Sequence, residues 1–161
     1  MADVSNSKLL ENNKDIRDLQ DVLVILVKTE WNDRVVDELE AGAVRVLHQN
    51  KIRTKTIVVP GCIEIPFAVQ QSCSQSNTAS AFIALGCVIR GGTPHFEYVC
   101  QSVTQGITQL NLTLPVPVIF GVLTTDTVDQ AMNRSKEIGG NKGKDAAMAA
   151  IEMVNLLLRI K

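Results

Sequence analysis

The stretch AFIALGCVIRGGTPHFEYV, residues 81–99, joins an apolar run to a glycine turn and then to a helical segment. Residues 81–89 carry no charge, and such a run predicts a strand that is covered on both faces. Gly91 and Gly92 then predict a turn after the apolar run, and a helix is expected from about 94 to 112. The stretch therefore predicts a strand–turn–helix unit, the building block of a parallel α/β sheet.

The turn in this unit is a candidate anion site. We expect Thr93 to be the helix N-cap and Pro94 to be the first helical residue. A helix start of this kind offers unpaired N–H groups and the positive end of the helix dipole. His95 would then lie beside the anion and could move protons, although an isolated histidine is more often only a capping residue. The pattern is neither a dinucleotide fingerprint nor a P-loop, so it predicts neither NAD nor ATP.

The same alternation of strand and helix extends along most of the chain. Parallel strands joined by right-handed crossovers are therefore expected, in an α/β fold with helices on both faces of the sheet. Asn32 or Asp33 is the expected cap of the first helix, and Asp126 or Thr127 that of the fourth. The predicted strands are 22–27, 55–59, 81–89 and 117–123, and the predicted helices are 32–49, 64–74, 94–112, 128–138 and 144–160.

Composition places narrow limits on the class of protein. With 161 residues, 45% of them hydrophobic and 20% charged, the chain is expected to form one globular domain over 21–161. The polar residues 1–20 are expected to form a flexible N-terminal arm. A net charge of −1 gives no electrostatic footprint for nucleic acid or for an anionic membrane.

Targeting and metal signals are also lacking in the sequence. The N-terminus has no secretory pattern, and no apolar run reaches the length of a membrane span. The four cysteines form no Cys-x-x-Cys pair and there are only two histidines, so no metal site is expected. A reducing cytoplasm is the predicted location.

Other candidate site residues follow the predicted strands. Trp31 comes after the first strand and suits a stacking platform for a flat heterocycle, although a lone tryptophan more often packs in a core or an interface. Glu64 is preceded by Cys62 and Ile63. Its carboxylate either stabilises the start of a helix or binds hydroxyl groups of a ligand, and the sequence favours neither interpretation over the other. Phe120 lies in the predicted fourth strand, where a phenylalanine normally packs in the core. Arg134 lies in the next helix, where an arginine is normally solvated, although its planar donor fork would also suit a phosphate.

Four motifs taken together resemble the lumazine synthase family, from about Val22 to Leu158. These are VPGCIEIPFA, GCVIRGGTPHFEYVC, PVIFGVLTTDTVDQA and GNKGKDAAMAAIEM, in the family's order. The resemblance implies a flavodoxin-like, three-layer fold with a mainly parallel sheet between helices. It also implies a transferase of riboflavin biosynthesis that needs no cofactor. The expected reaction condenses 5-amino-6-ribitylamino-pyrimidinedione with 3,4-dihydroxy-2-butanone 4-phosphate, giving 6,7-dimethyl-8-ribityllumazine, phosphate and water.

The resemblance also implies a role for each matching residue. His95 would be the acid/base residue. Ile63 stands where the family usually has an aromatic side chain, and Lys142 is a possible second phosphate contact. The implied substrate-binding residues are Trp31 stacking on the pyrimidine; Cys62, Ile63 and Glu64 along the ribityl chain; Cys87, Val88, Ile89 and Phe120 around the heterocycle; and Gly92, Thr93 and Arg134 at the phosphate.

In this family the site lies between subunits, and the neighbour supplies the phenylalanine and the arginine. A homo-oligomer is therefore expected, as a pentamer and possibly a 60-subunit icosahedral shell. The segment RSKEIGGNKG has the spacing of shell-forming members, without their usual glycine after the arginine and the frequent lysine at Ile138. The alternative class is a non-catalytic flavin- or lumazine-binding or shell-forming protein. A flavodoxin-like electron carrier would need an FMN phosphate loop, and KTEWND is not one.

Overall fold

The computed structural model describes residues 21–75 and 78–160, and its centre is a parallel sheet. The described strands are β1 (Leu23–Thr29), β2 (Arg53–Val59), β3 (Ala81–Ile89) and β4 (Val118–Thr125). They lie in the order β2-β1-β3-β4, and every neighbouring pair is parallel. The predicted α/β fold with a parallel sheet is confirmed. The arm expected at 1–20 lies outside the described residues.

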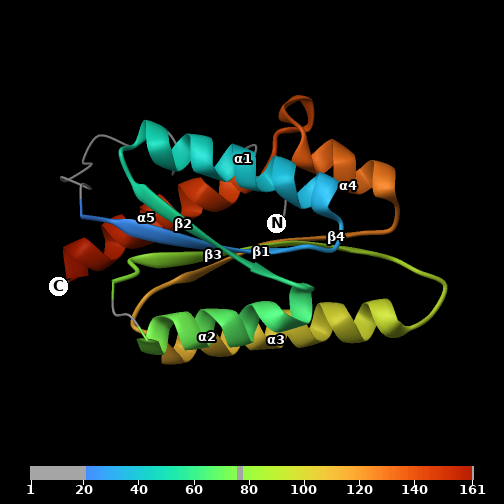
Figure 1. Cartoon of the computed structure of the whole chain (residues 1–161), viewed down its shortest axis with the longest axis horizontal. Coiled ribbons are helices and arrows are strands. Elements are labelled where there is room, and N and C mark those ends of the chain that lie inside the picture. The colour runs from blue at the N-terminus through green and yellow to red at the C-terminus, as the bar shows by residue number, and fades with distance from the viewer. Residues whose placement is uncertain (1–20, 76–77, 161) are drawn as a thin grey trace.

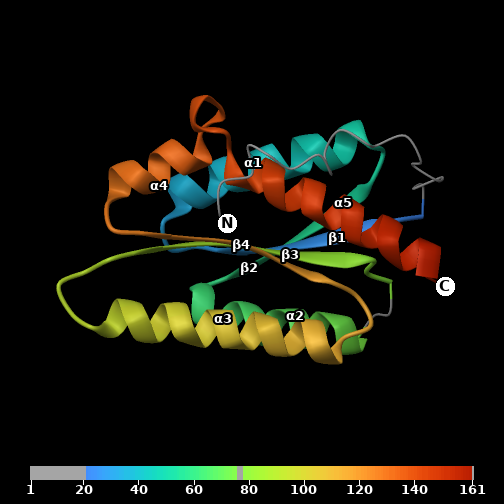
Figure 2. The same ribbon diagram turned by 180° about the vertical axis from the view of Figure 1, so that it is seen from behind.

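Helices cover both faces of the sheet in two layers (Figures 1 and 2). The layer on one face contains α1, α4 and α5, and the layer on the other face contains α2 and α3. No helix in the described part of the chain is long and apolar enough to cross a membrane. The helix bounds are α1 (Asp33–Gln49), α2 (Ile65–Gln75), α3 (His95–Thr113), α4 (Val128–Ser135) and α5 (Lys142–Ile160), with short 3-10 helices η2 (Cys62–Glu64) and η3 (Glu137–Gly139).

Strand pleating divides the apolar residues between two cores. Val24 and Leu26 of β1 belong to the core under α1 and α5, whereas Ile25 and Val27 belong to the core over α2 and α3. The first seven residues of β3 are all buried, and the six of them other than Gly86 alternate between the two cores. This is why the strand reads as a continuous apolar run rather than as an alternating one.

A buried asparagine, Asn141, joins three segments at the start of α5. Its side-chain nitrogen donates to the carbonyl oxygens of Glu38 in α1 and Ser135 in α4. Its side-chain oxygen accepts from the N–H groups of Gly143 and Lys144, in the first turn of α5. The amide thus satisfies the carbonyl at the end of α4 and the N–H of Gly143 at the start of α5, and it ties both helix ends to α1.

Two predicted helix boundaries are wrong. The helix expected over 128–138 ends at Ser135, because Lys136 is extended and the chain folds back until Gly139 meets the carbonyl of Asn133. A Cβ on Gly139 would lie 1.5 Å from that oxygen, so only glycine fits there. The last helix begins at Lys142, two residues before its predicted start.

The predicted caps have mixed outcomes. Thr127 caps α4, since its side chain accepts from the N–H of Gln130. Thr93 is not the N-cap of α3: Pro94 holds that position, because its carbonyl accepts the first bond of the turn, from Glu97. Asn32 holds the N-cap position of α1 in a left-handed conformation, but its side chain makes no cap bond.

Candidate functional site

The loops after three neighbouring strands form one pocket. Because β1 lies between β2 and β3, their carboxyl ends meet at one edge, where ligands bind in open α/β sheets. The cavity measures about 360 Å³, within the size range of small-molecule sites. This loop pocket is lined by Trp31, Asn32, Pro60, Gly61, Cys62, Ile63, Glu64, Cys87, Val88, Ile89, Gly91, Thr93, His95, Phe96 and Val99.

Trp31 forms an exposed wall of the loop pocket. Its side chain is 72% exposed, so its ring is not a core residue of this chain. Its backbone is fixed, because its N–H donates to the carbonyl of Pro60 and its carbonyl accepts from the hydroxyl of Thr29. An exposed aromatic ring on a fixed backbone can stack on a flat ligand.

The η2 turn provides a second wall, with Cys62 buried and Ile63 and Glu64 exposed. One carboxylate oxygen of Glu64 accepts from the N–H of Gly61 at 2.9 Å. This carboxylate therefore stabilises the turn and also lines the pocket, so the two sequence alternatives for it are compatible.

The end of β3 forms the pocket floor through Cys87, Val88 and Ile89. Burial raises the pKa of the Cys62 thiol to about 12 and that of Cys87 to about 11. Both cysteines are thus neutral thiols at physiological pH and serve as apolar lining rather than as nucleophiles.

The loop after β3 brings polar groups to the pocket. Thr93 and His95 both line it, and His95 is the first residue of α3. Gly91 lines it as well, whereas Gly92, the predicted contact, is exposed beside it and is not part of the lining. No lysine or arginine occurs among the described lining residues, so the loop pocket has no permanently charged cation for an anion.

The two remaining predicted residues lie in a different hollow. Phe120 and Arg134 line an edge pocket of about 220 Å³, together with Lys142 and residues 121–124 of β4. β4 is the last strand of the described sheet, and no residue lines both pockets. Lys142 forms an ion pair with Asp145 at 2.8 Å. The loop pocket thus brings together nine of the twelve predicted residues, with Gly92 exposed beside it, but it does not include Phe120 and Arg134.

Residues 21–158 match the family described as 6,7-dimethyl-8-ribityllumazine synthase. The chain belongs to this lumazine synthase family. A relative of that name from Parabacteroides distasonis is 43% identical over 143 residues, which are 87% of this chain and 89% of the relative. Another, from Porphyromonas gingivalis, is 44% identical over 140 residues, 85% and 86% of the two chains. Membership makes the chain a transferase of riboflavin biosynthesis.

The lumazine synthase loop pocket also contains residues that sequence reasoning missed. Asn32 is one of them: its side-chain nitrogen donates to the carbonyl of Cys87 at 2.8 Å and links the loops after β1 and β3. Phe96 and Val99 of α3 also line the pocket. Their spacing of three residues places them on the same helix face, and this spacing could have predicted their role. Pro60 and Gly61 line the pocket as well, whereas the sequence predicted only a turn at these residues.

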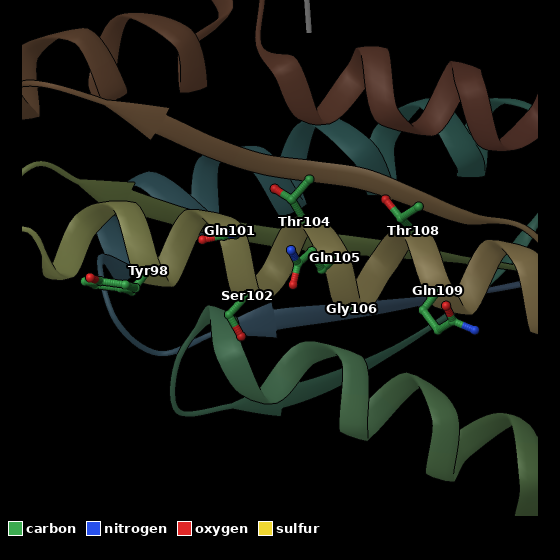
Figure 3. A pocket seen from close by; sticks show the side chains of 8 residues that line it. All are labelled: Tyr98, Gln101, Ser102, Thr104, Gln105, Gly106, Thr108 and Gln109. Carbon is green, nitrogen blue, oxygen red and sulfur yellow. The ribbon is translucent and has the colours of Figure 1, made fainter.

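Another hollow, distinct from the loop pocket and the edge pocket, lies along α3. It is shallow, measures about 840 Å³, and is lined by side chains of α3 alone (Figure 3). Its lining residues are Tyr98, Gln101, Ser102, Thr104, Gln105, Gly106, Thr108 and Gln109. No charged residue occurs in the sequence between Glu97 and Asp126. An exposed helix face without charge is typical of the centre of a protein interface.

Proposed function

We propose that this chain condenses 5-amino-6-ribitylamino-pyrimidinedione with 3,4-dihydroxy-2-butanone 4-phosphate, giving 6,7-dimethyl-8-ribityllumazine, phosphate and water. The reaction takes place in the loop pocket of one subunit, completed by the edge pocket of a neighbouring copy. One observation carries the shared site: the acid/base and ring-binding residues line one hollow, and the cationic residues line another.

The loop pocket binds the pyrimidine. Trp31 stacks on the heterocycle from its exposed position, and Val88 and Ile89 border the ring. The backbone of the η2 turn and the carboxylate of Glu64 bind the hydroxyls of the ribityl chain. Ile63 contributes packing at this wall with an aliphatic side chain, and a neighbouring copy's Phe120 covers the other side of the ring.

The phosphate of the second substrate binds at the loop before α3. The free N–H groups at the start of a helix and the hydroxyl of Thr93 are donors suited to an anion. The neighbour's Arg134 adds a planar pair of donors and the positive charge that the loop pocket lacks. Lys142, which lines the edge pocket beside Arg134, is the second cationic contact.

His95 transfers the protons. Attack of the pyrimidine amine on the ketone with loss of one water, loss of phosphate, and ring closure with loss of a second water are redox-neutral steps that each move a proton. An imidazole at the mouth of the pocket can accept and return such protons near neutral pH. Alignment of the two substrates supplies most of the rate, since effective molarities exceed what acid/base help contributes. These steps require neither a metal ion nor a cofactor.

The subunits associate in a closed ring with two different faces. The exposed apolar side chains Val58, Ile63 and Phe67 lie on β2, η2 and α2, at the opposite sheet edge from the edge pocket. Two unlike faces generate a cyclic, head-to-tail oligomer. The family resemblance favours five subunits, and the uncharged face of α3 is a suitable contact surface within such a ring.

Twelve such rings form a closed shell in our proposal. The short turn between α4 and α5 adds no bulk that would keep rings apart, and it protrudes from its helix layer with Ile138 fully exposed (Figure 1). Sedimentation near neutral pH tests the assembly. A species of about sixty subunits supports the shell. A single species of about five subunits over a wide concentration range contradicts it.

A non-catalytic lumazine-binding protein is the alternative. Binding alone does not need both a histidine in the loop pocket and an arginine in the edge pocket, so we favour the enzyme. A product-formation assay with both substrates separates the two, because a binding protein forms no lumazine above the uncatalysed rate.

All four cysteines are free thiols, which suits the proposed cytoplasmic location.

A further inference from the structure

Arg90, the residue between β3 and the glycine turn, contacts two segments beside the loop that carries Thr93 and His95: the first turn of α3 and the end of β4 with the residue that follows it. Its Nε donates to a carboxylate oxygen of Asp126 at 2.7 Å, and its Nη1 pairs with the carboxylate of Glu97. Its guanidinium carbon lies 4.1 Å from the centre of the Phe96 ring. Its backbone N–H donates to the carbonyl of Thr125 at 2.9 Å.

These contacts close a ring around the loop. Arg90 precedes the loop, and Phe96 and Glu97 follow it in the first turn of α3. The arginine side chain therefore joins the two ends of the loop directly, and Asp126 ties both to the segment between β4 and α4. A planar guanidinium can hold two carboxylates and stack on an aromatic ring at the same time.

The loop itself has little else to fix its shape. A Cβ placed on Gly91 or Gly92 would meet no atom within 4 Å, so the space beside each glycine is open. The start of α3 has no side-chain cap. Glycine retains more backbone freedom than other residues, so a loop of this composition needs an external constraint to keep one geometry.

The Arg90 side chain is already engaged by groups of the chain itself. Its charge is matched by Asp126 and Glu97, whose hydrogen bonds raise the pKa of the guanidinium further. The same hydrogen bond lowers the pKa of Glu97, so this carboxyl stays ionised at neutral pH. Arg90 is also not among the residues that line the loop pocket.

We infer that Arg90 is a positioning residue that clamps the 91–95 loop, so that Thr93 meets the phosphate and His95 meets the reacting atoms. The inference rests on the proposed roles of Thr93 and His95. It adds that the accuracy of the loop depends on the joint contact of Arg90 with Asp126, Glu97 and Phe96.

Steady-state kinetics of R90M and R90K, with both substrates varied, test the clamp. We expect R90M to lower kcat/KM by about tenfold to a hundredfold, since small misplacements at a reacting centre have effects of this size. The KM of the phosphate substrate should rise, and the KM of the pyrimidine should stay within about twofold. R90K keeps the charge but loses the fork, so it should recover only part of the loss.

R45M is the matched control. Arg45 is similarly exposed and also forms an ion pair, with Glu137, but on the opposite helix layer. Its removal should leave both KM values unchanged. The double variant R90M/E97Q should be no slower than R90M alone, because both changes remove the same contact.

The outcomes separate this inference from the proposed function. If T93A and H95A impair the reaction while R90M resembles R45M, the clamp is refuted and the proposed site stands. If R90M raises both KM values equally, Arg90 has only a general structural role and the clamp is again refuted. If T93A and H95A have no effect, the proposed site itself is wrong.

Discussion

Cys62 and Cys87 show how burial determines what a side chain can do in this pocket. Their raised pKa values, about 12 and about 11, leave very little thiolate at pH 8. Alkylation requires the thiolate. Iodoacetamide at pH 8 should therefore label Cys73, which is only partly buried, before it labels Cys62 or Cys87.

Peptide mass spectrometry of the folded protein measures this order, with the urea-unfolded protein as the control in which the cysteines react alike. Labelling of Cys62 or Cys87 at the unfolded rate would mean that these thiols are reactive. The lining would then have chemistry that we have not assigned to it.

His95 is the residue on which turnover should depend most. H95A should lower kcat by roughly 10²- to 10⁴-fold, the usual contribution of general acid/base catalysis, with little change in either KM. The protein should be slow rather than inactive, because alignment of the two substrates remains. His48, a surface histidine that contacts Thr54, provides the matched control variant H48A. Unchanged kcat in H95A would remove this residue from the mechanism.

At the scale of the elements, Gly143 of α5 lies against the backbone of α1. A Cβ on this glycine would lie 1.9 Å from the backbone oxygen of Leu39, and a backbone atom cannot turn aside as a side chain can. G143A should therefore separate the helices and reduce the stability of the fold by about 1–3 kcal/mol or more.

Thermal unfolding measures the effect of G143A, and G91A is its control. A Cβ on Gly91 meets no atom within 4 Å, so G91A should not lower the unfolding temperature. Equal stability of G143A and the unchanged protein would show that α1 and α5 can shift without cost. The packing argument for this contact would then be wrong.

Most elements were predictable because their signals are local. The apolar run at 81–89 gave β3 with both bounds correct, and the periodicity of 32–49 gave α1 to within a residue. The end of α4 was not predictable, because Ser135 is held by Asn141 and Gly139 folds back onto Asn133. Such contacts depend on tertiary structure and do not alter the hydrophobic periodicity of the sequence.

The candidate site followed the same division. The glycines and His95 were enough to predict a candidate site in the loop after β3. The other candidate site residues came from the motif resemblance. Neither spacing nor periodicity could indicate that Phe120 and Arg134 lie in a separate hollow. The family resemblance implied it, by assigning these two positions to a neighbouring subunit, and the place of β4 as the last strand of the described sheet gives its structural basis.

For the whole molecule, the central claim is that one active site needs two chains. In our proposal, the loop pocket, whose described lining holds no lysine or arginine, and the edge pocket with Arg134 and Lys142 complement each other across a contact between neighbouring subunits. The two hollows are not brought together within one chain. Activity should therefore depend on assembly, and a monomer should have none.

Complementation between H95A and R134A tests this claim most directly. Each variant alone has every site damaged, whereas a mixed ring contains some sites with His95 from one chain and Arg134 from its neighbour. Dissociation and joint reassembly of equal amounts should restore about a quarter of the original activity, since each half of a site is intact in half of the subunits. Mixing without dissociation is the control. Activity no higher than the mean of the two separate variants would place both residues in the same chain's site and contradict the account.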